Sequence, residues 1–180
     1  MLPAHKVVGV AAALSILLAL SGCAGEAESP TASLTETKGP TQLLRNEASS
    51  RIPTGAIESI AGEEDLSVAC KTDDDPEGLY RSWQSSLLAT IDKDAAWRVA
   101  QISTDLADSF IEDGWYVSGT KDGAETTTLT RPGALSTIKF TSTEGNAEGV
   151  GATVHINATG PCVLTEGPDS TEVTKLEGAK

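Results

Sequence analysis

The fold is decided by residues 94–113, which read DAAWRVAQISTDLADSFIED. Large apolar side chains recur there every three or four positions, at Val99, Ile102, Leu106 and Phe110. This spacing places them on one face of a helix, while most of the charged residues fall on the others. Asp92 or Asp94 can cap the start, and Gly114 can end the helix. The stretch therefore predicts an amphipathic helix that packs on another layer of structure.

After this helix the apolar period changes from three or four residues to two. Apolar and polar residues alternate at 115–118, at 138–141 and at 150–159, and residues 126–131 are rich in β-branched side chains. Turn sequences separate these runs, at 121–123 and at Pro132-Gly133. Short connections between strands produce antiparallel pairing, so the second half of the chain predicts an antiparallel sheet.

Residues 79–91 fit two patterns, because Trp83, Leu87 and Ile91 suit both a helical step and one face of a strand. We choose a strand, since residues 66–70 alternate just before and residues 73–78 are typical of a hairpin loop. The expected fold class is α+β: an antiparallel sheet of about five to six strands, packed by one long helix. A second, short helix near residues 41–50 would lie at the N-terminal edge and stop before Pro53.

Composition divides the chain into four parts. All seven aromatic residues lie within residues 41–165, which we expect to form a single α+β domain. Residues 23–40 contain one large apolar side chain, Leu34, and predict a flexible acidic tether. Residues 166–180 are similar in composition and predict a disordered tail. Residues 1–22 form a separate segment with no acidic residue.

The charge balance excludes some classes of partner. The chain has 13 Lys and Arg against 26 Asp and Glu, a formal net charge of −13. Nucleic acids and anionic lipid surfaces are bound by basic faces, and this composition supplies none. We expect no nucleic-acid partner.

The first 22 residues are typical of an export signal. His5 and Lys6 precede an apolar stretch from Val7 to Leu20. That stretch is shorter than the roughly 20 residues of a membrane-spanning helix but suits the core of a signal peptide. Alternatives are an ordinary secretory signal and a short membrane anchor. The stretch ends in Leu20-Ser21-Gly22-Cys23, which resembles the lipobox of bacterial lipoproteins.

The order of features along the chain resembles small cell-envelope lipoproteins of actinobacteria. The lipobox, the acidic tether, Ile52-Pro53, the strand carrying Cys70, the helix ending at Asp113-Gly114 and a last strand running into Cys162 carry this likeness. The resemblance implies that Cys23 carries diacylglycerol and becomes the first residue of the mature chain. It also implies attachment to the outer face of the cytoplasmic membrane. This family is of unknown function, so the resemblance implies no activity.

With Cys23 committed to lipid, Cys70 and Cys162 are the two cysteines left. An exported compartment permits disulfides, and two cysteines allow one pairing. We predict a Cys70–Cys162 disulfide, with two buried free thiols as the alternative. A zinc site is disfavoured, because His155 is the sole histidine after the signal.

Two features of the sequence are candidate sites of chemistry. His155 would have to serve any Ser/His/Asp hydrolase, but alternation places it opposite Val154 and Ile156, on the polar face of a strand, and no Gly-x-Ser-x-Gly elbow occurs. Asp73, Asp74 and Asp75 are a weak candidate for calcium, without the ligand spacing of an EF-hand. We therefore expect no catalytic residues, no resident metal and no cofactor.

The sequence favours a non-enzymatic function in the cell envelope. In this interpretation the chain is a lipid-anchored protein that binds an envelope protein, a polymer or a small ligand. The alternative is a small envelope hydrolase or a ligand- or metal-binding domain. Trp97 and Trp115 flank the amphipathic helix, and we expect both in the core rather than in a ligand patch.

Overall fold

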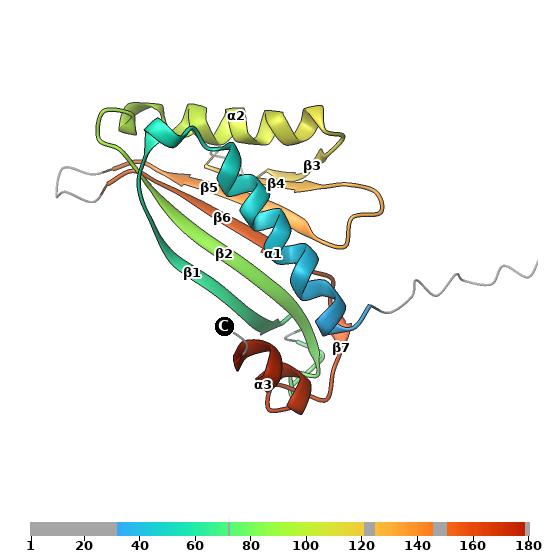
Figure 1. Cartoon of the computed structure of the whole chain (residues 1–180). Helices are drawn as coiled ribbons and strands as arrows, with labels where there is room; N and C mark the ends of the chain where they lie inside the picture. Colours follow the sequence, from blue (N-terminus) through green and yellow to red (C-terminus); the bar gives the residue numbers. More distant parts are fainter. Residues whose placement is uncertain (1–31, 72, 121–124, 146–150, 179–180) are drawn as a thin grey trace, which may run out of the picture. The chain divides into compact units, whose positions relative to one another are not determined.

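The computed structural model describes residues 32–71, 73–120, 125–145 and 151–178. Within them the chain forms three α-helices, two short 3-10 helices and seven strands (Figure 1). The helices are α1 (Leu34–Arg51), α2 (Val99–Glu112) and α3 (Thr171–Gly178), with 3-10 turns at Thr54–Ala56 and Ala96–Arg98. The strands are β1 (Ile57–Ala69), β2 (Tyr80–Ile91), β3 (Tyr116–Thr120), β4 (Thr126–Thr130), β5 (Thr137–Thr143), β6 (Thr153–Thr159) and β7 (Val163–Leu164).

The strands form one sheet in the order β1-β2-β6-β5-β4-β3, with β7 paired to β2. Every pairing among the described strands is antiparallel. The α+β class and the antiparallel sheet are confirmed, and residues 79–91 are a strand as expected. The sheet has one strand beyond the expected five to six, because the two-residue β7 follows Cys162. The expected turn at 121–123 lies outside the described residues.

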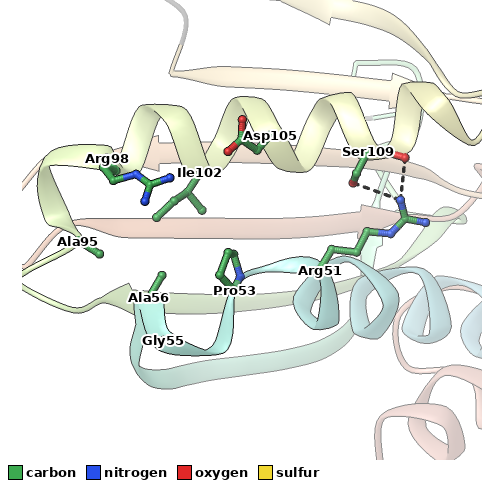
Figure 2. Close-up of a pocket in the computed structure, with 9 residues that line it drawn as sticks. All are labelled: Arg51, Pro53, Gly55, Ala56, Ala95, Arg98, Ile102, Asp105 and Ser109. Atoms are coloured by element: carbon green, nitrogen blue, oxygen red, sulfur yellow. Dashed lines mark hydrogen bonds between the residues drawn. The ribbon is translucent and has the colours of Figure 1, made fainter.

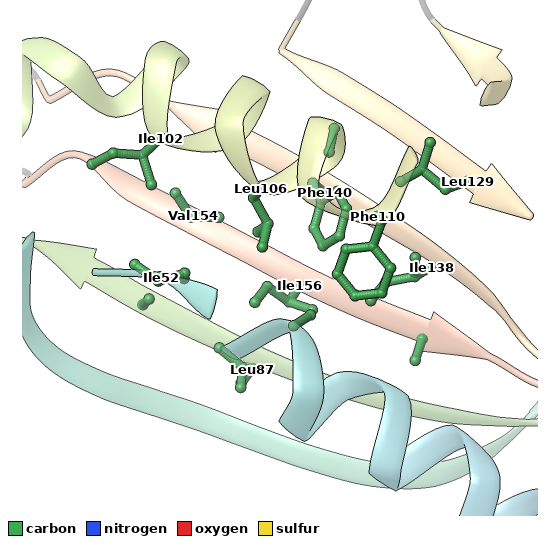
Figure 3. Close-up of a cluster of buried hydrophobic side chains, with 14 of the residues drawn as sticks. Ile52, Leu87, Ile102, Leu106, Phe110, Leu129, Ile138, Phe140, Val154 and Ile156 are labelled. Carbon is green, nitrogen blue, oxygen red and sulfur yellow. The ribbon is translucent and has the colours of Figure 1, made fainter. Parts of the chain in front are cut away.

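Helices α1 and α2 lie on one face of the sheet and enclose the main core (Figure 1). Ile102, Leu106 and Phe110 of α2 are directed onto Val154 and Ile156 of β6 (Figure 3). The predicted periodicity of α2 is therefore confirmed. Its end at Gly114 is confirmed as well: this residue has φ of +84°, a conformation that glycine adopts without strain.

The two tryptophans beside α2 differ from each other. Trp115 is buried and packs edge-on against Phe110, with ring centroids 5.5 Å apart. Trp97 is 82% exposed, so its expected place in the core is wrong. It lies in the 3-10 turn before α2, where its Nε1 donates to the carbonyl oxygen of Asp94, and the helical face that reaches the sheet begins two residues later at Val99.

The expected tether is wrong over its last part, because α1 begins at Leu34 and not near residue 41. Ser33 and Glu36 form a capping box, in which each side chain accepts a hydrogen bond from the other residue's backbone N–H. Gly39 and Pro40 are within this helix, and both lie on its exposed side. Residues 23–31 lie outside the described part of the chain.

The buried face of α1 is partly polar, which hid it from a search for apolar periodicity. Thr37, Thr41 and Arg45 are buried on it together with Leu34, Leu44 and Ala48. The two threonine hydroxyls donate to carbonyl oxygens of the helix itself, and the Thr41 hydroxyl also contacts that of Ser136 at 2.8 Å. Because these polar atoms are hydrogen-bonded, their burial carries little penalty.

The expected disordered tail is wrong over residues 171–178, which form α3. Val173 of α3 is buried with Leu34, Trp83 and Val163, a second core cluster at the start of α1. The Thr35 backbone N–H and hydroxyl both donate to a carboxylate oxygen of Glu172. The tail and the tether thus stabilise each other, a contact between segments more than 130 residues apart that local composition does not reveal.

The predicted Cys70–Cys162 disulfide is confirmed, with a Cα–Cα distance of 5.8 Å. Cys70 follows β1 and Cys162 precedes β7, so the bond ties the outer hairpin to the end of β6. Strand β7, which follows Cys162, lies at the same end of the sheet as α3 (Figure 1).

The burial of Leu34 yields a stability prediction. Leu34→Ala should lower the free energy of unfolding by about 2–5 kcal/mol, because it removes a fully buried side chain from the α1–α3 cluster. Leu43→Ala is the matched control: the same substitution in the same helix, at a position that is 70% exposed, should change it by less than about 0.5 kcal/mol. Urea unfolding of both variants measures this. Equal, small effects would place Leu34 outside the packed structure.

Candidate functional site

A pocket of about 240 Å³ lies between the end of α1 and α2 (Figure 2). One wall is the end of α1 and the turn after it, and the other is the segment leading into α2 and the first turns of that helix. The first wall contributes Arg51, Pro53, Gly55 and Ala56, and the second contributes Ala95, Arg98, Ile102, Asp105 and Ser109. Arg51 and Arg98 stand at opposite ends of the pocket in Figure 2.

Local sequence explains why this space stays open. Pro53 restricts the residue before it to extended backbone, so α1 ends and the chain turns away through Thr54–Ala56. Three of the residues that face each other here are Gly55, Ala56 and Ala95, which have little or no side chain to fill the gap. The small size of these residues leaves a space between the two walls.

Arg51 is held in place at one end of the pocket by contacts that connect α1 to α2. Its Nη1 donates to the backbone oxygen of Ser109 at 2.8 Å and to the Ser109 hydroxyl at 3.1 Å. Its Nη2 donates to the carboxylates of Glu47 and Asp113, and its guanidinium lies over the ring of Phe110 at 4.0 Å. Burial lowers the pKa of Arg51, but the hydrogen bonds to Asp113 and Glu47 outweigh it and raise the pKa above its usual value.

Arg98, at the other end, is held much less tightly. Its side chain is exposed, and its guanidinium lies 5.7 Å from the ring of Trp97. In the described part of the chain it forms no hydrogen bond or ion pair through that side chain. Asp105, the one carboxylate in the lining, accepts a hydrogen bond from Gln101 Nε2 at 2.6 Å. The lining therefore combines the apolar side chains of Pro53, Ala56 and Ile102 with the guanidinium of Arg98.

His155 lies on the face of the sheet opposite α1, α2 and the pocket. It is half-buried, opposite the core residues Val154 and Ile156, which confirms the expected side of the strand. Burial lowers the pKa of His155, the charge of Lys139 lowers it further, and Glu64 opposes both. Its neighbours across the sheet are Leu88 on β2 and Thr141 on β5, and the Thr141 hydroxyl is hydrogen-bonded to that of Thr126.

The three aspartates of the hairpin loop do not converge on one point. Asp73 and Asp74 are exposed, whereas Asp75 is buried and its carboxylate accepts hydrogen bonds from the backbone N–H groups of Leu79 and Tyr80. Asp75 therefore stabilises the turn that leads into β2. No group of three His, Cys, Asp or Glu side chains suited to a metal ion occurs among the residues described.

Cys23, the predicted lipid anchor, lies outside the described residues. Among the helices described, none is both long and apolar enough to cross a membrane.

The residues of the pocket were not found from the sequence. Arg51 and Arg98 have the sequence pattern of ordinary surface charges, and the two walls are far apart along the chain, since even Ala56 and Ala95 are separated by 39 positions. The pairing of Pro53-x-Gly55-Ala56 with Ala95-Ala96 as small-residue turns is the one signal that could have pointed to a gap. No family model, no curated protein and no solved structure matches this chain.

The lowered pKa of His155 predicts a pH effect on stability. The unfolded chain takes up a proton near pH 6.5 that the folded chain resists, so stability should be full above this pH and should fall as the pH drops toward the lower folded pKa. His155→Gln should reduce that fall. Urea unfolding of the wild type and of the variant at about pH 8 and about pH 5 measures this fall. The difference between the two proteins in free energy of unfolding at pH 8 is the reference. An identical pH dependence in both proteins would contradict the assignment.

Proposed function

We propose that this chain is an exported lipoprotein that acts as a non-enzymatic binding protein on the outer face of the cytoplasmic membrane. The lipobox Leu20-Ser21-Gly22-Cys23 supports acylation at Cys23. The Cys70–Cys162 disulfide is compatible with an oxidising compartment outside the cytoplasm. Two or more acyl chains suffice to hold a protein on a membrane without a second contact.

The observation that carries the binding role is the pocket between α1 and α2. Small-molecule sites are concave and largely apolar, with a few polar groups that fix orientation. Here Pro53, Ala56 and Ile102 supply the apolar surface, while Arg98 and Asp105 supply charge. The volume of about 240 Å³ is below the roughly 300–1,000 Å³ typical of drug-sized ligands, so the ligand is small.

The segment that carries the proposed anchor joins the domain at the end of α1 away from the pocket. Ten residues, 24–33, separate Cys23 from α1. They join the domain at Leu34, whereas the pocket begins at Arg51, about 27 Å away along the 18-residue helix. A lipid anchor at Cys23 would therefore connect to the end of α1 opposite the pocket.

The alternative of a small envelope hydrolase has less geometric support. It would require a nucleophile next to a base. The pocket hydroxyl, Ser109, donates to the backbone oxygen of Leu106 and accepts from Arg51. His155 is on the opposite face of the sheet. These two side chains cannot act together, so a binding role is favoured.

The anchor is tested by detergent-phase partitioning. The wild-type chain should enter the detergent phase, and its mature N-terminus should be Cys23 with the mass of attached acyl chains. Cys23→Ala should retain its signal or be shed from the membrane. Cys162→Ala is the control: it loses a cysteine of the disulfide but should keep the anchor. An unmodified N-terminus at any other residue would rule out this assignment.

The pocket is tested by screening small compounds against the full chain in nanodiscs with ligand-observed NMR. We expect binders that are displaced or lost in Ala95→Leu, because the larger side chain occupies the pocket. Ala100→Leu is the matched control, the same change at an exposed position on α2 outside the lining. If every binder tolerates Ala95→Leu as well as Ala100→Leu, the pocket is not the binding site.

A further inference from the structure

The charges in the pocket narrow the chemistry of its ligand, given the proposed function as a binding protein. The whole chain carries twice as many acidic as basic residues, 26 against 13. The lining of the pocket reverses this ratio, with two arginines and one aspartate. An anion repelled by most of the surface would meet guanidinium groups in this lining.

The two arginines are not equivalent. The Arg51 guanidinium is neutralised by Glu47 and Asp113, and it also donates to Ser109. It has little charge left to offer a ligand. Arg98 has no carboxylate within ion-pair distance among the described residues, and its guanidinium extends along the pocket in Figure 2. Arg98 is therefore the cation that an incoming anion would meet.

The order of side chains leading into and along α2 gives the pocket a direction. Arg98, at the end of the 3-10 turn before α2, precedes Ile102 by four residues, and Ile102 precedes Asp105 by three. All three line the pocket, with Ile102 between Arg98 and Asp105 (Figure 2). A ligand along these three side chains would meet a cation, then apolar surface, then a carboxylate.

We propose that the pocket binds a small monocarboxylate with a short apolar body, and that Arg98 anchors the carboxylate. The planar guanidinium matches a carboxylate with two parallel N–H···O bonds. The apolar body packs on Ile102 and faces Pro53 and Ala56 across the pocket. Asp105 at the far end repels a second negative charge, so a dicarboxylate of the same length binds more weakly.

The proposal is tested with a matched set of six-carbon probes, titrated against the full chain in nanodiscs of zwitterionic lipid with empty discs as the blank. The probes are hexanoate, neutral hexanamide, cationic hexylamine, the dianion hexanedioate and hexyl phosphate. Hexanoate should bind at least about tenfold tighter than hexanamide, the scale of a charge-assisted hydrogen bond. Hexylamine and hexanedioate should bind more weakly than hexanoate.

Variants separate the Arg98 contact from the general field of the protein. Arg98→Gln should weaken hexanoate binding about tenfold or more, and Arg98→Lys should weaken it less, because lysine keeps the charge but not the fork. Lys93→Gln is the control: it removes the same charge from an exposed residue outside the pocket and should change the affinity by less than about twofold. Because Arg98 is exposed, its variants should melt like the wild type.

The outcomes distinguish this inference from the proposed function. Equal binding of hexanoate and hexanamide, both lost in Ala95→Leu, would overturn the anion inference and leave the pocket as a binding site. Tighter binding of hexyl phosphate than of hexanoate would overturn the assignment to carboxylates. Equal loss in Arg98→Gln and Lys93→Gln would overturn the role of Arg98. Absence of hexanoate binding would overturn the inference, and the compound screen would then decide the function of the pocket independently.

Discussion

The close packing of α1 on the sheet is the constraint on which the rest of the domain depends. A Cβ added at Gly160, at the end of β6, would lie 3.2 Å from side-chain atoms of both Thr37 and Thr41. Contact this close is possible because the sheet presents glycine and the helix presents threonines that hydrogen-bond within it. The helix axis is thereby fixed relative to β2 and β6. The second core cluster lies at the start of this helix, and the pocket lies at its end.

Each end of α1 then has a different task. At its start, Leu34 joins Trp83, Val163 and Val173 in a second core cluster, which orders the C-terminal helix. At its end, Arg51 is held by groups on both sides of the interface with α2 and by the ring of Phe110. Arg51 therefore bridges α1 and α2, and beyond it the small residues Gly55 and Ala56 face Ala95 across the pocket. The pocket forms where the residues on both sides have small side chains or none.

The pocket between α1 and α2 includes none of the residues that the sequence offered as sites of chemistry. The acidic hairpin loop uses Asp75 to hold its own backbone, and His155 is set on the far side of the sheet from the pocket. The guanidinium of Arg98 lies beside the apolar side chains of Pro53, Ala56 and Ile102, in a chain with twice as many acidic as basic residues. The proposed preference of the pocket for an anion therefore depends on Arg98, which has no ion-pair partner among the described residues.

The sequence by itself determined those elements whose burial is periodic and apolar. Helix α2 repeats at three and four residues, and β5 and β6 alternate, so their elements and faces could be predicted from local pattern. The disulfide followed from the cysteine count. Only the tertiary structure decided α1, α3, the exposure of Trp97 and the pocket. The buried face of α1 contains threonine and arginine, and α3 is ordered by a segment more than 130 residues earlier. Contacts between distant segments leave no periodic pattern in the local sequence, so the composition of these segments predicted a tether and a disordered tail.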